Sequence, residues 1–135
     1  MSTGFFIAGS VFVGIAAVLH VFIFWLESIT WTAPGTWRRF GVASQEDAET
    51  IRPMAYNQGF YNGFLAVGAA CGIILLASPG LKQAGLALEL FAAASMVFAA
   101  TVLVVSTPKL ARAALTQGLL PLIGVILLLI GVFAA

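Results

Sequence analysis

Four long apolar runs divide the sequence, and short polar or proline-containing segments separate them. We place the runs at about residues 5–29, 54–77, 83–106 and 115–134. Each run is close to the ~20 residues that an α-helix needs to cross ~30 Å of hydrocarbon. The pattern therefore predicts a single all-α domain, an integral membrane four-helix transmembrane bundle with both chain ends on one side of the membrane.

The connection between the first two runs is the longest one. Its segment from Ser44 to Asp47 resembles a helix-capping box, and Ala48 and Ile51 have the spacing of one apolar helix face. We therefore expect a short interfacial helix over about residues 45–52, which ends before Pro53. Pro121 lies inside the fourth run and is expected to loosen that helix near its start.

Basic residues are distributed unevenly between the two sides of the predicted bundle. The first and third connections contain all of the lysines and arginines except Lys82, namely Arg38, Arg39, Arg52, Lys109 and Arg112. The positive-inside rule then predicts that these connections face the cytoplasm and that both termini lie on the non-cytoplasmic side of the membrane. Three tryptophans near the inner end of the first run are expected to form an interfacial aromatic belt: Trp25, Trp31 and Trp37.

Composition narrows the classes of partner and chemistry. The chain is 61% hydrophobic and only 8% charged, so its expected surroundings are a lipid bilayer. A net charge of +1 argues against nucleic acid as a partner. One histidine and one cysteine cannot build a closed zinc site or a two-histidine haem site within one chain, so we expect no metal and no cofactor.

Polar residues inside the apolar runs gather at one depth. His20 lies just past the middle of the first run, and Glu27 lies near its inner end. The second run starts at that same end, with Asn57, Gln58, Tyr61 and Asn62. The inner ends of the third and fourth runs add Thr101, Ser106, Thr107, Thr116 and Gln117. Nearly all intramembrane polarity is therefore expected in the inner half of the bundle.

Helical spacing places these residues on shared faces. His20 and Glu27 are seven residues apart, so they share a face and lie roughly 10.5 Å apart along the axis. On the second run, Asn57 with Tyr61 and Gln58 with Asn62 are pairs of the i,i+4 kind. We expect these four side chains to form one arc between His20 and Glu27, and we take all six as candidate ligand-binding residues.

His20 and Glu27 are also the candidate catalytic groups, because buried titratable groups in membranes mark functional pathways. For the amides, hydrogen bonding between helices is an equally good explanation.

Glu89 is the exception to this depth pattern, because the third run begins on the outer side. We expect its side chain to extend toward the outer interface or to meet Lys82. At that depth it cannot pair with Glu27, which argues against a two-carboxylate mechanism of the glycosidase kind.

Small residues recur on the second run, where Gly59 with Gly63 and Gly68 with Gly72 form two Gly-x-x-x-Gly motifs. Such surfaces let another helix approach closely. We expect association into at least a homodimer through the small-residue surfaces of this run or similar ones elsewhere.

The string Asn57-Gln58-Gly59-Phe60-Tyr61-Asn62-Gly63-Phe64-Leu65, preceded by His20, Glu27, Trp31 and Phe40, resembles a bacterial family of small four-span membrane proteins. That family is known only as a domain of unknown function. The resemblance covers nearly the whole chain and implies a four-helix protein of the inner membrane, without implying a substrate or mechanism.

The leading hypothesis is a polar pocket, open toward the cytoplasmic half, that binds a small or amphipathic molecule. Glu27 would be the anionic or proton-accepting group, His20 the deeper proton carrier, and the second-run residues would orient the ligand. The alternatives are a proton-coupled small-molecule transporter acting as a dimer, a membrane-embedded acid–base enzyme of the isomerase kind acting on a lipid-like substrate, and a structural or accessory subunit.

Overall fold

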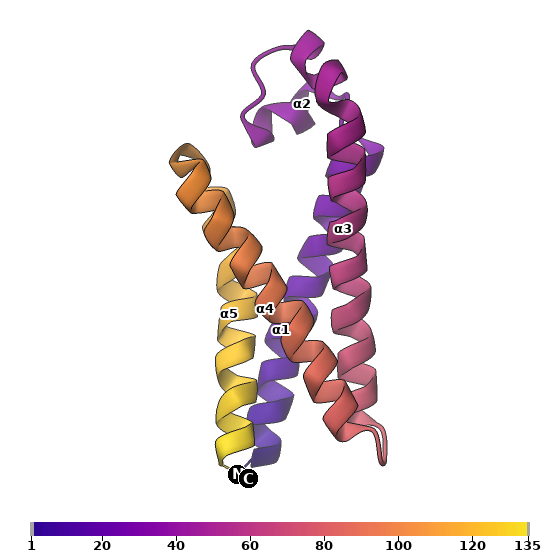
Figure 1. Ribbon diagram of the computed structural model, residues 1–135, viewed down its shortest axis with the longest axis vertical. Helices are drawn as coiled ribbons and strands as arrows, with labels where there is room; N and C mark the ends of the chain where they lie inside the picture. The colour runs from indigo at the N-terminus through magenta and orange to yellow at the C-terminus, as the bar shows by residue number, and fades with distance from the viewer. Residues whose placement is uncertain (1, 135) are drawn as a thin grey trace.

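The computed structural model describes residues 2–134, and these residues form helices without any strand. The four long helices are α1 (Ser2–Phe24), α3 (Gln45–Ala77), α4 (Lys82–Ser106) and α5 (Ala111–Phe133). Together with their short extensions, all four are long and apolar enough to cross a membrane. The predicted all-α four-helix architecture is confirmed (Figure 1).

The helices form a closed ring in which each packs against two neighbours. α1 contacts α3 and α5, and α4 contacts the same two helices from the other side. Both chain ends and the turn between α3 and α4 lie at the lower end of the bundle in Figure 1. The upper part of α4 leans away from α1 and α3, so the ring is tightest below and opens above.

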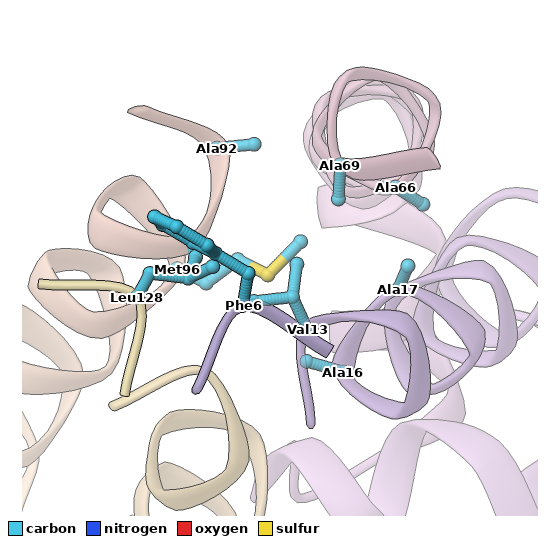
Figure 2. Packing of buried hydrophobic residues seen from close by; sticks show 10 residues of the cluster. Phe6, Val13, Ala16, Ala17, Ala66, Ala69, Ala92, Met96 and Leu128 are labelled. Carbon is cyan, nitrogen blue, oxygen red and sulfur yellow. The ribbon is translucent and has the colours of Figure 1, made fainter. Parts of the chain in front are cut away.

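The apolar core fills the lower and middle parts of this ring. Figure 2 shows Phe6, Val13, Met96 and Leu128 pointing into the space between α1, α4 and α5. The remaining labelled members of the cluster are alanines: Ala16, Ala17, Ala66, Ala69 and Ala92. A core built largely from alanine lets the helix backbones approach closely, as is typical of membrane bundles.

Glycines make the closest contact, which joins α3 to α4. A Cβ atom at Gly72 would lie 2.6 Å from the backbone nitrogen of Glu89, and one at Gly85 would overlap the backbone at Leu76. Gly68 lies against Ala92 with room for a Cβ at 3.6 Å. Self-association through the small-residue surfaces of this helix, or similar ones elsewhere, remains a prediction. The surface of Gly68 and Gly72 is covered by α4 of the same chain, so these two glycines pack within the bundle.

A compact cap covers the upper end of α1 and α3. It comprises the π-helix η1 (Trp25–Ile29), the short helix α2 (Pro34–Trp37), the 3-10 helix η2 (Arg38–Phe40) and the start of α3. Trp31 and Trp37 are buried in it, and their indole nitrogens donate to the Ala48 carbonyl oxygen at 2.8 Å and to Gln45 Oε1 at 3.0 Å. The expected aromatic belt is therefore wrong for these two tryptophans, because both satisfy their N–H groups within the cap; Trp25 is exposed.

Two prolines are accommodated inside continuous helices. Ser44 caps α3 as expected, with its Oγ accepting a hydrogen bond from the backbone N–H of Asp47 at 3.0 Å. The helix then continues through Pro53, so residues 45–52 are its first two turns and not a separate interfacial helix. In α5, Pro121 is fully buried and the helix also runs through it without a break. Packing against neighbouring helices compensates for the missing N–H in such cases.

Candidate functional site

A cavity of about 610 Å³ lies between the diverging upper parts of the bundle. Helices α1, α3, α4 and α5 contribute to its wall, as do η1, η2 and η3 (Pro108–Leu110). Its polar lining residues are His20, Glu27, Arg39, Gln58, Asn62, Thr116 and Gln117. Several of these, such as Arg39, Gln58 and Thr116, are exposed in the isolated chain, so the cavity opens to the surface of the bundle.

His20 forms the deep end of the polar wall and is only 2% exposed. Its Nδ1 lies 2.8 Å from the carbonyl oxygen of Ala16, one turn earlier on α1. Because a carbonyl oxygen can only accept, Nδ1 must carry the proton in this contact. The remaining ring nitrogen, Nε2, is then free to accept a hydrogen bond from a group in the cavity when the imidazole is neutral.

Glu27 is positioned by an interruption of the α-helix. The Thr30 N–H donates to the Trp25 carbonyl oxygen at 3.1 Å, an i to i+5 bond that makes this turn a π-helix. Such π-turns inside helices occur frequently at functional sites. Glu27 lies in the middle of the turn and is 8% exposed.

Gly59 allows this π-turn to lie directly on α3. A Cβ atom at Gly59 would overlap Ser28 Oγ and would lie 3.0 Å from Glu27 Cβ. Ser28 Oγ also donates to the Tyr56 carbonyl oxygen at 2.9 Å, which fastens the turn to α3. Gly59, the first glycine of the first Gly-x-x-x-Gly motif, therefore packs against the same chain. This contact places Glu27 next to the polar face of α3.

Asn62 completes the link between the two helices. Its Nδ2 donates to Glu27 Oε2 at 2.8 Å and to the Gln58 carbonyl oxygen at 3.2 Å. One carboxylate oxygen of Glu27 is thus held by an amide from α3, and Gln58 lines the cavity beside it. The structure brings together four of the six predicted residues: His20, Glu27, Gln58 and Asn62.

Asn57 and Tyr61 do not join this cavity, which corrects the prediction of a single four-residue arc. Both are exposed, Tyr61 to 56%, and neither lines the wall. The physical reason is the 100° step of an α-helix, which spreads these four positions over roughly 140°. The half of that arc that carries Gln58 and Asn62 faces the cavity, and Asn57 and Tyr61 lie on the other half.

Other lining residues were not predicted as members of the site. Arg39 and Phe40 come from η2 and reach the cavity because the cap folds over the upper end of α1. The Arg39 Nε donates to the Gly35 carbonyl oxygen at 3.1 Å, which fixes the base of its guanidinium group. Thr116 and Gln117 were expected at this depth on α5, and depth was the signal that could have added them to the set.

The lining suits a ligand with a polar head and an apolar body. Glu27, His20 and the two amides offer acceptors and donors on one wall, and Arg39 is the one cation among the residues that line it. Apart from Thr116 and Gln117 on α5, apolar residues form the rest, including Leu19, Phe22, Ile23, Leu26, Phe40, Leu103 and Leu110. Among residues 2–134, no group of three or more His, Cys, Asp or Glu side chains is arranged to hold a metal ion.

The structure places the Glu89 side chain inside the bundle, so the prediction that it extends toward the outer interface or meets Lys82 is wrong. Its side chain is 0% exposed, and Oε2 accepts a hydrogen bond from Ser10 Oγ on α1 at 3.2 Å. Lys82 does not pair with it; the lysine Nζ lies 4.5 Å from the centre of the Phe6 ring. The side chain cannot extend outward because the close contact at Gly72 directs this face of α4 into the bundle.

These features define a small multi-pass helical membrane protein with a polar cavity in one half of its bundle. Residues 14–129 match the model of the family described as "Protein of unknown function (DUF1304)", and the chain belongs to that family. Neither the curated proteins nor the solved structures contain a match.

Proposed function

We propose that the protein binds an amphipathic molecule in the cavity beside His20 and Glu27, in the half of the membrane next to the cytoplasm. The observation that carries the proposal is the shared wall of His20, Glu27, Gln58 and Asn62 around about 610 Å³ of space. This volume lies within the ~300–1,000 Å³ range of small-molecule pockets. An intramembrane titratable group that faces a cavity is by default a functional-site hypothesis.

The head group that fits this wall is a cation or a hydrogen-bond donor. Glu27 accepts, and Asn62 already holds its Oε2 in place. Nε2 of His20 adds a second acceptor when the imidazole is neutral, because Nδ1 is committed to the Ala16 carbonyl. An alkylamine would place its ammonium group at Glu27, and its chain would lie against the leucines and phenylalanines of the wall.

The test compares amphiphiles that differ only in their head group. We expect an alkylamine to raise the unfolding temperature of the purified protein more than the alcohol or the carboxylate of the same chain length. Glu27→Gln keeps the size of the side chain but removes its charge. We expect it to fold and to bind the amine about 10- to 100-fold more weakly, because a hydrogen bond to a charged group contributes ~1.5–3 kcal/mol.

Asn57→Ala provides the matched control, since Asn57 is exposed and lies outside the cavity. This variant should keep the wild-type response to the amine. An equal response of Glu27→Gln and wild type would remove Glu27 as the binding group. The absence of a head-group preference in the wild type would favour the structural or accessory role instead.

A further inference from the structure

A second polar site lies in the opposite half of the bundle, where the sequence pattern predicts almost no intramembrane polar residues. A groove of about 450 Å³ separates the lower part of α1 from the end of α3 and the start of α4. Its wall is apolar except for Thr3, Ser10 and Lys82. Ser10 connects this groove to the interior, because its Oγ is the group that contacts Glu89 Oε2.

The carboxyl group of Glu89 is enclosed on every side. Its exposed fraction is 0%, the backbone of α3 at Gly72 closes the space beside its Cβ, and Ser10 covers one of its oxygens. The other oxygen, Oε1, is buried and has no hydrogen-bond partner among the described residues. An ionised carboxylate in such surroundings lacks the partners that buried charges require, and a buried carboxyl in that position takes up a proton instead.

The charged and titratable groups around Glu89 do not supply a counter-ion. On α1, His20 lies ten residues beyond Ser10, roughly 15 Å further along the helix, with the alanine-rich core between them. Before its contact with Glu89, α3 carries charge only in the turns up to Arg52, and α5 carries only Arg112, near the opposite end. On α4 itself, Lys82 is two turns earlier and its Nζ lies against the Phe6 ring.

We propose that Glu89 is a proton-binding site that exchanges with the groove through the hydroxyl of Ser10. In the charged form the Ser10 O–H donates to Oε2. In the protonated form the carboxyl O–H donates to Ser10 Oγ, and the serine hydrogen rotates toward the groove, since a hydroxyl can donate and accept. The proton therefore passes from water in the groove to Ser10 Oγ as the serine hydrogen moves to Glu89, and the return is the reverse.

This site gives the bundle a titratable group in each half, with an apolar layer of Val13, Ala16, Ala93 and Met96 between them. A transporter that couples ligand movement to protons must exchange protons with both sides of the membrane, and a titratable group in each half of the bundle provides for this. The inference does not depend on ligand binding at Glu27, because the two sites share no residue.

Infrared spectroscopy of the full-length protein in lipid nanodiscs tests the proton directly. We expect a carbonyl band of a protonated carboxylic acid at neutral pH that is lost in Glu89→Gln. Glu27→Gln is the matched control, and the band assigned to Glu89 should persist in it. A wild-type spectrum without that band, or its persistence in Glu89→Gln, would overturn the proposal.

Ser10 variants test the exchange path and provide a readout if Glu89→Gln does not fold. Ser10→Ala removes the hydrogen bond, so the carbonyl band should shift to higher frequency and its exchange in deuterated water should slow. Ser10→Thr retains a hydroxyl and should exchange at the wild-type rate. An unshifted band in Ser10→Ala would show that the carboxyl is not the partner of Ser10, and equal exchange in all three proteins would exclude Ser10 as the path.

Discussion

At the scale of single residues, the candidate site depends on one missing side chain as much as on its polar groups. Gly59 lets the π-turn that contains Glu27 lie on α3, and Asn62 then reaches the carboxylate at 2.8 Å. The Ser28 hydroxyl adds its bond to the Tyr56 carbonyl oxygen at the same contact. The hydrogen bond from Asn62 to Glu27 therefore requires that no Cβ is present at residue 59.

Gly59→Ala is expected to destabilise the fold and to loosen the site. The added Cβ overlaps Ser28 Oγ and approaches Glu27 Cβ to 3.0 Å, so the π-turn must move away from α3. Overpacking of this kind costs ~1–3 kcal/mol. Thermal unfolding in detergent measures the change. Gly4→Ala is the control, because nothing lies within 4 Å of the Cβ it adds; equal unfolding temperatures for the two variants would contradict the packing role of Gly59.

At the scale of the helices, α3 and α4 are joined backbone to backbone. Gly72 and Gly85 have no side chain to hold the two helices apart, and the contact at Gly72 directs Glu89 into the bundle. The motif of Gly68 and Gly72 has the pattern that is typical of helix dimers. Its partner here is α4, and self-association of the chain remains a prediction that needs another surface.

Gly72→Ala and Gly68→Ala distinguish packing of α3 against α4 from self-association between copies of the chain. The first adds a Cβ at 2.6 Å from the Glu89 nitrogen and should lower the unfolding temperature by the equivalent of ~1–3 kcal/mol. The second adds a Cβ in ordinary contact with Ala92 at 3.6 Å and should be tolerated. Thermal unfolding and the mass of the protein in detergent are the measurements. A normal unfolding temperature with a smaller mass in Gly72→Ala would instead assign that glycine to an interface between copies.

At the scale of the whole molecule, the two ends of the helix ring differ. The helices pack closely at one end, the closed end, and α4 leans away from α1 and α3 at the other, the open end. The open end carries the cap, the cavity and all basic residues except Lys82. The closed end carries both termini, the groove and Glu89. The charge difference between the ends is the property that orients such a protein in a membrane.

Both termini are expected on the non-cytoplasmic side, with the cap and cavity facing the cytoplasm. Fusions to the C-terminus measure this directly, because some reporters are active only in the cytoplasm and others only outside it. The outside-only reporter should be active. Strong activity of the cytoplasmic reporter would reverse the sides assigned to the cavity and to Glu89, without changing their separation within the bundle.

The sequence by itself determined the four helices, their directions and the depth at which most polar residues lie. Hydropathy and proline positions are read along the chain, and depth follows from counting residues along each helix. Those two quantities were enough to place His20, Glu27, Gln58 and Asn62 at similar depth, and all four line one cavity.

Only the tertiary structure decided which way each side chain faces at its depth. Rotation of a helix depends on the neighbours it packs against, and this separated Asn57 and Tyr61 from the cavity and buried Glu89. The structure also carries α3 through Pro53 as one continuous helix. The cap depended on contacts between segments distant in sequence, such as that of Trp31 with Ala48, and it brought Arg39 to the site. A one-dimensional pattern of polarity carries no information on helix rotation or on such contacts, because both arise from the close packing of surfaces in three dimensions.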